Sequence, residues 1–295
     1  MMPDNSNGFT YCHEHLHIDL SVQKQDIDCK LDQYELIKQE LLELKKIGVC
    51  NIIEVTNFFM GRNPHFIEDL IRDTGMNVLV STGYYMEGFF PECLGSMSVE
   101  DIAQTMIDEI EIGIDGSSLK ASLIGEIGSS KDVFTETEQK VFKAAALAHL
   151  QTGCPISTHT SFSTMGRQQA ILLRENGVNL SNVTIGHCDL RDNFDDLIWL
   201  LEQGCYVQID TIGKNAYYPD SKRVGVIEGL INRGYVKQLM LSMDITRRSH
   251  LKANDGLGFA YLIESFVPKL LDQGVSEAQI EMMLKNNPAR FFKIK

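Results

Sequence analysis

Two histidines, His13 and His15, stand two residues apart near the start of the chain, in the segment TYCHEHLHIDL. Successive side chains of a strand point to opposite faces, so a strand here directs both imidazoles to one side and Cys12, Glu14 and Leu16 to the other. Neutral imidazole is the commonest metal ligand in proteins, and such a pair supplies half of a chelate. A histidine pair alone is more often incidental than metal-bound, so its meaning depends on partners elsewhere in the chain.

Four further residues of metal-binding type lie at or near the ends of later apolar segments. These residues are Glu126, His159, His187 and Asp244. Each alone has an ordinary structural explanation, such as a hydrogen-bonded core histidine, a salt-bridge partner or a helix N-cap. Buried carboxylates without partners are costly, however, so their repetition calls for a cation if the fold brings them together.

The combined set of imidazoles and carboxylates, without thiolate, suits zinc, manganese, iron or cobalt better than calcium or copper(I). It fits two divalent ions better than one, and Glu126, which stands between the histidine groups, is the expected bridge. Two such metal ions make hydroxide available near neutral pH. Asp244 is expected to serve both as a metal ligand and as the general base. The predicted chemistry is hydrolysis. The predicted metal ligands are His13, His15, Glu126, His159, His187 and Asp244.

The chain alternates short apolar, β-branched runs with longer segments of helical periodicity. After a first strand within residues 10–20, the predicted strands are 49–56, 77–83, 123–127, 155–159, 183–187, 205–210 and 238–244. The predicted helices are 32–46, 64–74, 168–175, 195–203, 223–233 and 276–292, with two more that begin at Ser98 and Thr135. Such alternation implies parallel strands joined by right-handed crossovers. Eight units predict a closed (β/α)8 TIM barrel.

An open doubly wound sheet is the alternative architecture, but no GxGxxG turn follows the first strand. The sequence shows no internal repeat, linker or low-complexity segment, so we expect residues 1–295 to form a single domain. Active sites of such barrels lie at the C-terminal ends of the strands. The barrel therefore places all the candidate ligands on one face.

A basic cluster follows the last two predicted strands, in the segments IGKNAYYPD and DITRRSHLK. Barrels often bind phosphate at these loops, and arginine suits bidentate contact with phosphate or carboxylate. We therefore expect a small anionic substrate, such as a phosphorylated compound. Ordinary surface salt bridges are the alternative explanation of the cluster. The candidate substrate-binding residues are Lys214, Tyr217, Arg247, Arg248 and His250.

The composition is that of an ordinary soluble globular protein, with 43% hydrophobic and 23% charged residues. The formal net charge of -13 argues against nucleic acid or an anionic membrane as a partner. The N-terminal residues lack a signal-peptide pattern, which predicts a cytoplasmic protein. The 7 cysteines form no CxxC pair and are expected to be reduced thiols. The sequence does not decide the oligomeric state, and a homo-oligomer is one possibility.

Several segments closely resemble the phosphotriesterase-like branch of the amidohydrolase superfamily: TYCHEHLHIDL, IGEIGSS, VTIGHCDLRDN, QIDTIGKNAYYPD and LSMDITRRSHLKA, with NNPARFF similar to the superfamily's closing motif. The resemblance implies a barrel with a binuclear centre, usually zinc, that activates a bridging hydroxide. It assigns the first histidine pair and Asp244 to the more buried metal, and His159 with His187 to the more exposed one. Glu126 would bridge the two.

One departure from the branch concerns this bridge. Phosphotriesterases usually carry a carboxylated lysine there, whereas this chain has Glu126, and Lys120 stands too early to replace it. Phosphotriesterase activity is therefore not simply inherited. The branch also includes lactonases, some of which act on sugar-lactone phosphates.

These observations predict a binuclear metal-dependent hydrolase that attacks an ester-like bond, in a lactone or a phosphorylated sugar lactone. A phosphotriesterase or an amidase on the same centre is one alternative. A metal-dependent isomerase or lyase, and a metal-binding barrel without catalysis, are the others.

Overall fold

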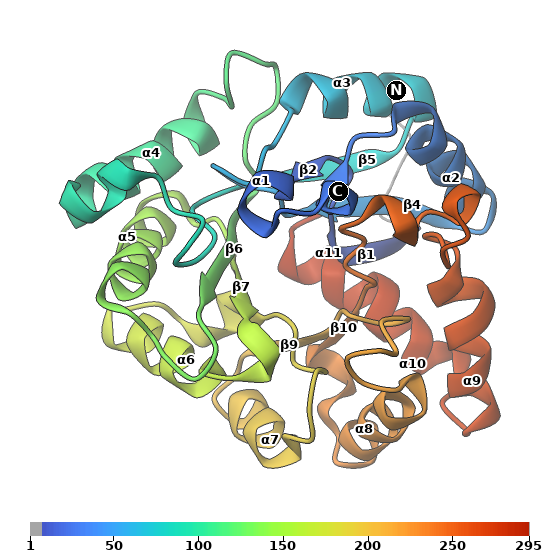
Figure 1. The fold of residues 1–295 in the computed structure, drawn as a ribbon. Coiled ribbons are helices and arrows are strands. Elements are labelled where there is room, and N and C mark those ends of the chain that lie inside the picture. Colours follow the sequence, from blue (N-terminus) through green and yellow to red (C-terminus); the bar gives the residue numbers. More distant parts are fainter. Residues whose placement is uncertain (1–7, 295) are drawn as a thin grey trace.

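Eight parallel strands form the centre of the molecule in the computed structural model, which describes residues 8–294. Their order in the sheet follows their order in the chain, as the predicted barrel requires (Figure 1). Most of the N-terminal segment on which the absence of a targeting signal was predicted lies outside the described residues. The strands are β1 (Phe9–Glu14), β4 (Val49–Glu54), β5 (Asn77–Thr82), β6 (Leu123–Ser129), β7 (Ile156–Thr160), β8 (Val183–Ile185), β9 (Tyr206–Ile209) and β10 (Leu239–Leu241).

The first and last strands meet through side chains, which nearly closes the barrel. Ser242, just after β10, accepts a hydrogen bond from the backbone N–H of His13 at 3.1 Å. Glu14 points away from His13, as predicted, and accepts hydrogen bonds from the backbone N–H groups of Met243 (2.7 Å) and Ile245 (2.9 Å). The buried Glu14 carboxylate therefore has a structural role, which is to hold the end of β10 against β1.

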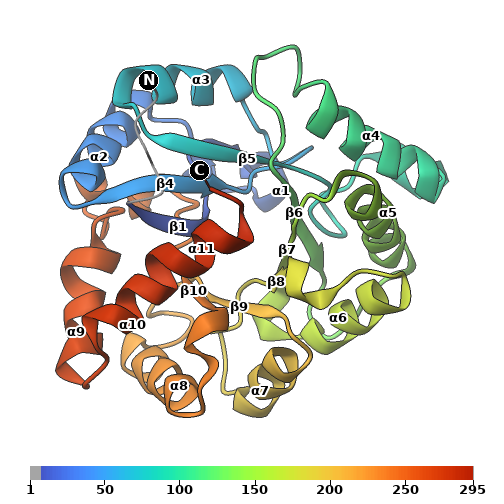
Figure 2. The same cartoon turned by 180° about the vertical axis from the view of Figure 1, so that it is seen from behind.

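An outer ring of helices surrounds the strands, as Figures 1 and 2 show from the two ends of the barrel. The helices predicted to begin at Ser98 and Thr135 do so with capping boxes, in which the hydroxyl accepts a hydrogen bond from the third helical N–H. The helix that begins after Thr135 ends at Gly153, which adopts a left-handed backbone with φ 70°. These helices are α2 (Tyr34–Lys46), α3 (Pro64–Thr74), α4 (Val99–Glu111), α5 (Glu136–Thr152), α6 (Gly166–Glu175), α7 (Phe194–Glu202) and α8 (Asp220–Asn232).

The C-terminal segment differs from the single helix predicted over 276–292. It begins at the predicted Ser276 cap as α10 (Glu277–Glu281), widens into a π-helical turn over 282–286 and continues as α11 (Asn287–Phe291). Pro288 explains the wider turn, because proline lacks the N–H of a regular helix and its ring crowds the preceding turn. A similar π turn precedes α9 (Val267–Asp272), whose second residue is Pro268 and which the sequence did not predict.

Helix α11 crosses the end of the barrel opposite the candidate site (Figure 2). Phe291 and Phe292 pack there in one buried cluster with residues of the strands, including Leu123 and Met240. The Asn287 amide donates hydrogen bonds to the carbonyls of Val236 (2.8 Å) and Leu239 (2.7 Å). The NNPARFF segment therefore closes the floor of the barrel, rather than packing on its outer wall.

The loop after β1 folds over the other end of the barrel (Figure 1). It contains a short antiparallel pair, β2 (Ile18–Asp19) and β3 (Lys30–Leu31), with the single helical turn α1 (Ser21–Lys24) between them. The seven cysteines are all free thiols, as predicted. Among the described residues, no helix is both long and apolar enough to cross a membrane.

Candidate metal centre

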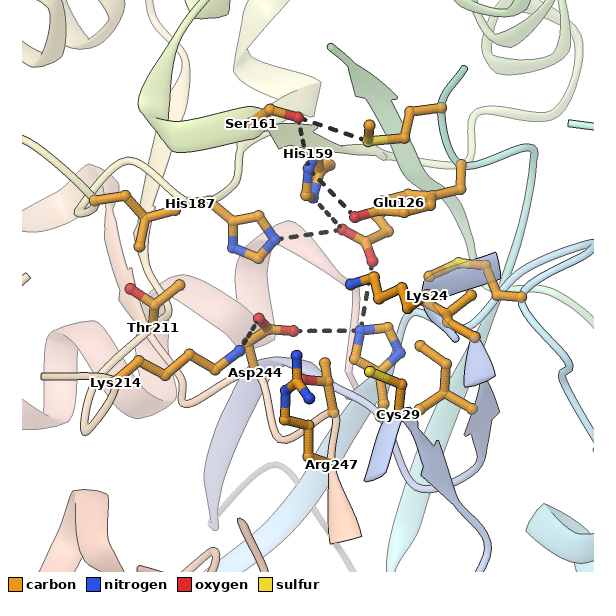
Figure 3. A pocket seen from close by; sticks show the side chains of 18 of the residues that line it. Lys24, Cys29, Glu126, His159, Ser161, His187, Thr211, Lys214, Asp244 and Arg247 are labelled. Carbon is orange, nitrogen blue, oxygen red and sulfur yellow. Dashed lines mark hydrogen bonds and ion pairs between the residues drawn. The ribbon is translucent and has the colours of Figure 1, made fainter. Parts of the chain in front are cut away.

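Glu126, in β6, is the centre of a buried cluster of four histidines. Figure 3 shows it beside two of them, His159 and His187. Its Oε2 atom lies 3.3 Å from His13 Nε2, 3.1 Å from His159 Nδ1 and 3.5 Å from His187 Nε2. Its Oε1 atom lies 3.4 Å from His15 Nε2. Oε2 thus lies near one histidine of the first pair and both of the second, and Oε1 near the other histidine of the first pair. One carboxylate therefore reaches both pairs, as expected for a bridging ligand between two cations.

Asp244 stands at the edge of this cluster. Its Oδ1 atom lies 3.3 Å from His15 Nε2 and 3.9 Å from His13 Nε2, while its other oxygen accepts a hydrogen bond from the Lys214 ammonium. The structure therefore brings together all the residues predicted as metal ligands, and Asp244 lies on the side of the first histidine pair.

Two glycines let the chain approach its neighbours closely just before a candidate ligand. A Cβ atom on Gly125 would lie 2.4 Å from the carbonyl oxygen of Ser157, and one on Gly186 would lie 2.3 Å from that of Thr158. Contacts this short exclude any side chain, so only glycine places Glu126 and His187 where they are. The IGE and IGH segments thus encode close packing of adjacent strands.

Two candidate ligands have an uncommon backbone conformation. His187 has φ 53° and Asp244 has φ 54°, in the left-handed region that L-residues seldom occupy. Each lies beyond its strand, because β8 and β10 end earlier than the predicted strands 183–187 and 238–244. The left-handed turn directs each side chain back over the barrel mouth, and such conformations concentrate at functional sites.

Asp210, which the sequence analysis missed, orients two of the histidines. Its Oδ1 atom lies 3.0 Å from His187 Nδ1 and its Oδ2 atom 3.3 Å from His13 Nδ1. The Gln208 side-chain oxygen lies 3.1 Å from the same His13 nitrogen. These contacts leave the Nε2 atoms of His13 and His187 facing Glu126. Carboxylates behind the ligands orient histidine rings in the same way at metal sites. Asp210 directly follows β9, so its strand-end position was the signal for it.

The other two histidines have their own partners. His15 Nδ1 lies 2.7 Å from the Thr56 hydroxyl, which donates to the buried Glu54 carboxylate at 2.5 Å. Burial raises the pKa of Glu54 to about 7, although the nearby His15 opposes the shift. His159 turns its Nε2 atom toward the hydroxyls of Tyr85 and Ser161, both at 3.3 Å. Each imidazole is therefore held with one nitrogen free to face the cluster.

The charges of the cluster call for cations at its centre. Burial alone would raise the pKa of Glu126, but the histidines outweigh burial and hold that pKa well below its usual value. Burial would lower the pKa of His15, but Asp244 and Glu126 raise it to about 10. The buried carboxylates are thus balanced only when imidazoles carry protons, a role that divalent cations at the same donors would fill. His13 Nε2, moreover, is buried without a hydrogen-bond partner among the described residues. The donor set therefore fits metal ions.

We expect Asp210→Asn to weaken metal binding about 10- to 100-fold. The neutral amide replaces a charged carboxylate and no longer accepts hydrogen bonds from both histidine rings. The measurement is a titration of the purified protein with a competing chelator. Asp196→Asn is the matched control, since this aspartate pairs with Arg167 and Arg191 at the surface. An affinity equal to that of the wild type would contradict the role of Asp210.

The cluster opens into a cavity of about 280 Å³ at the C-terminal ends of the strands (Figure 3). Such a volume suits a small molecule. Apolar side chains such as Met86 and Phe89 form part of its lining, beside polar groups from the loops. Four of the predicted substrate-binding residues line this cavity: Lys214, Tyr217, Arg247 and His250.

The fifth, Arg248, is not among the described residues that line the cavity. Its guanidinium instead donates to the Lys30 carbonyl at 2.7 Å and to Asp32 at 2.6 Å. His250 lines the cavity, but burial and the nearby Lys214 lower its pKa to about 4. It is therefore neutral at neutral pH and offers a hydrogen bond rather than a charge.

Lys120 has no part in the site, in agreement with its early position in the sequence. Its exposed side chain donates to the Glu111 carbonyl at 2.6 Å. Glu126 therefore stands at the centre of the histidine cluster, and its own strand, β6, contains no lysine.

Comparisons with known proteins agree with this geometry. The phosphotriesterase homology protein of Escherichia coli (strain K12) is 56% identical over 292 residues, which cover 99% of this chain and 100% of that protein. A crystal structure of it, complexed with phosphate in the active site, matches with a TM-score of 0.97 over 97% of this chain and 99% of that chain.

More distant relatives have different names. An N-acetyltaurine hydrolase of Danio rerio is 31% identical over 89% of this chain and 78% of its own length. A lactonase from Listeria monocytogenes is 25% identical, with a TM-score of 0.94 over 99% of this chain and 96% of that chain. The model of the phosphotriesterase family matches residues 2–292. The chain therefore belongs to the phosphotriesterase family, whose members are metal-dependent hydrolases.

Proposed function

We propose that this protein uses two divalent metal ions, zinc foremost, to hydrolyse an ester-like bond in a small anionic substrate, either a lactone or a phosphorylated sugar lactone. The observation that carries the proposal is a single cavity in which the Glu126 cluster lies beside the cationic side chains of Lys24, Lys214 and Arg247. The cluster provides the place for bond cleavage, and the cations favour a negative group on the substrate.

The contacts of the cluster support the following assignment of the metal ligands. His13 and His15 with Asp244 would hold one ion, His159 and His187 the other, with Glu126 shared between them. Bound at these donors, the ions would lower the pKa of water and polarise the bond to be cleaved.

Asp244 acts as the general base in this proposal. Burial raises its pKa, but Lys214 and the histidines outweigh burial and hold the pKa well below its usual value, so the carboxylate is ionised at neutral pH. Asp244 accepts the proton of the attacking water and delivers it to the leaving oxygen. Tyr217, Arg247 and His250 line the wall of the same cavity and are expected to orient the substrate.

The substrate class is tested with a panel of neutral lactones, phosphorylated lactones, phosphate triesters and N-acyl amino acids, assayed with the metal-loaded enzyme. We expect the phosphorylated lactones to have the highest kcat/KM, because their phosphate meets the cations of the cavity. Metal analysis should give about two equivalents per chain. Hydrolysis of triesters alone, or less than one equivalent of tightly bound metal, would refute the proposal.

An amidase is the second candidate, because one relative is named an N-acetyltaurine hydrolase. An N-acyl substrate with an anionic end would use the same cavity and the same cations, so the geometry alone does not separate amide from ester. Preference for N-acyl compounds in the panel would favour it. The mass of the product separates both from an isomerase or lyase, since hydrolysis adds water to the substrate.

A further inference from the structure

The two arginines that the sequence offers as anion-binding groups are already paired with acidic residues. Arg247 contacts Asp26 at 2.8 Å and Asp28 at 3.4 Å, in the loop after β1. Arg248 contacts Asp32 at 2.6 Å. A substrate anion would therefore have to compete with these carboxylates for either guanidinium.

These contacts fasten the loop after β10 to the loop after β1. Asp28 also accepts hydrogen bonds from the backbone N–H of Ser249 at 2.7 Å and from its hydroxyl at 2.6 Å. The interactions join parts of the chain that are 221 residues apart. The arginines thus act as a clasp between two loops at the mouth of the barrel.

Lys214 is also paired, because its ammonium donates to Asp244. Of the three cationic side chains that line the cavity, Lys24 is the remaining one. Among residues 8–294, no carboxylate oxygen lies within 4.0 Å of the Lys24 ammonium, so Lys24 forms no ion pair with the described residues. Its ammonium instead lies 6.0 Å from the centroid of the Phe89 ring, on the same cavity wall.

The loop that carries Lys24 is well anchored. Asp19 accepts hydrogen bonds from the N–H (3.1 Å) and the hydroxyl (2.6 Å) of Ser21 at the start of α1, and forms an ion pair with Lys30 at 3.1 Å. The clasp described above holds the other side of the loop. Figure 3 shows Lys24 reaching into the pocket from the side opposite Lys214. An anion bound there gains the full charge of Lys24 without breaking an existing ion pair.

We infer that Lys24 is the residue that makes the cavity select a substrate with an anionic group. The inference rests on the proposed function for the kind of bond that is cleaved. The binding of the anion by Lys24 does not depend on it. Arg247 lines the same cavity, but Asp26 and Asp28 offset its charge, so it favours an anionic group less than Lys24 does. Loss of Lys24 therefore changes the preference between charged and neutral ligands more than loss of Arg247 does.

The kinetic test compares a γ-lactone with the same lactone carrying a phosphate group. We expect Lys24→Gln to raise KM for the phosphorylated lactone about tenfold and to leave kcat/KM for the neutral lactone within about twofold. Lys24→Arg should retain most of the preference. Lys46→Gln is the matched control, since it removes an exposed lysine at the end of α2, and it should change neither value. Arg247→Gln should change the preference between the two lactones less than Lys24→Gln does.

A binding measurement keeps the inference separate from the proposed function. Calorimetric titration with glycerol 3-phosphate, and with glycerol as the uncharged reference, needs no turnover. We expect about tenfold weaker binding of glycerol 3-phosphate to Lys24→Gln than to the wild type or Lys46→Gln. If neither lactone is hydrolysed but this difference appears, the proposed function fails and the role of Lys24 stands. Equal binding by the wild type and Lys24→Gln, or equal loss for both lactones, would overturn the inference.

Discussion

Asp244→Asn should reduce turnover by about 10³-fold or more while the protein remains folded. The amide matches the carboxylate in size but cannot accept the proton of the attacking water, and general bases contribute about 10² to 10⁴ in rate. Loss of the charge also removes the partner of Lys214 and one contact of His15 at 3.3 Å. Because two roles are lost together, we expect the effect at the upper end of that range. The measurement is kcat on the best substrate of the panel, with metal content determined on the same sample.

The control for this variant is Asp69→Asn, which changes an exposed aspartate that pairs with Arg72 on α3. It should retain the wild-type kcat. Thermal unfolding followed by circular dichroism shows whether Asp244→Asn is folded. A folded Asp244→Asn variant with two equivalents of metal and unchanged kcat would remove Asp244 from the mechanism.

The alternation of strands and helices was predictable because its signals are local. The apolar face and the Asn63 cap of α3 lie within a few residues of each other, and the predicted range 64–74 is the observed one. The capping boxes at Ser98, Thr135 and Ser276 are likewise contained within four residues. From eight such units the barrel follows, and with it the common face of the candidate ligands.

Asp210 was missed although the same rule applied to it. It ends a predicted strand just as His159 does. Its importance comes from contacts with His13 and His187, whose distances in the sequence give no pattern. Second-layer residues are recognised only once the first layer has been placed in space.

The mouth of the barrel was the least predictable part. The basic residues after β10 were visible in the sequence, but their acidic partners Asp26, Asp28 and Asp32 lie near the other end of the chain. Composition cannot show which charges are paired. Lys24, by contrast, is an exposed lysine in a four-residue helix, and only the fold places it on the cavity wall.

Glu126→Gln is expected to reduce the bound metal from about two equivalents to one or fewer, and to abolish turnover. Glu126 Oε2 faces three histidines at 3.1 to 3.5 Å, and Oε1 faces His15. Glutamine has nearly the same shape, but its NH₂ group cannot ligate a cation and its oxygen carries no charge, so it cannot be shared between two ions. The measurement is elemental analysis after dialysis against a weak chelator, with kcat on the same samples.

Glu40→Gln is the matched control, because Glu40 is also a buried carboxylate but accepts hydrogen bonds from the backbone N–H groups of Lys252 and Phe259, away from the cluster. It should keep both metal equivalents even if its stability falls. Chelation should lower the unfolding temperature of the wild type and of Glu40→Gln. It should have less effect on Glu126→Gln, since a ligand stabilises the folded state less when it binds more weakly. Two metal equivalents with unchanged affinity in Glu126→Gln would show that the carboxylate is not the bridge, and the histidines would then have to hold the two ions independently.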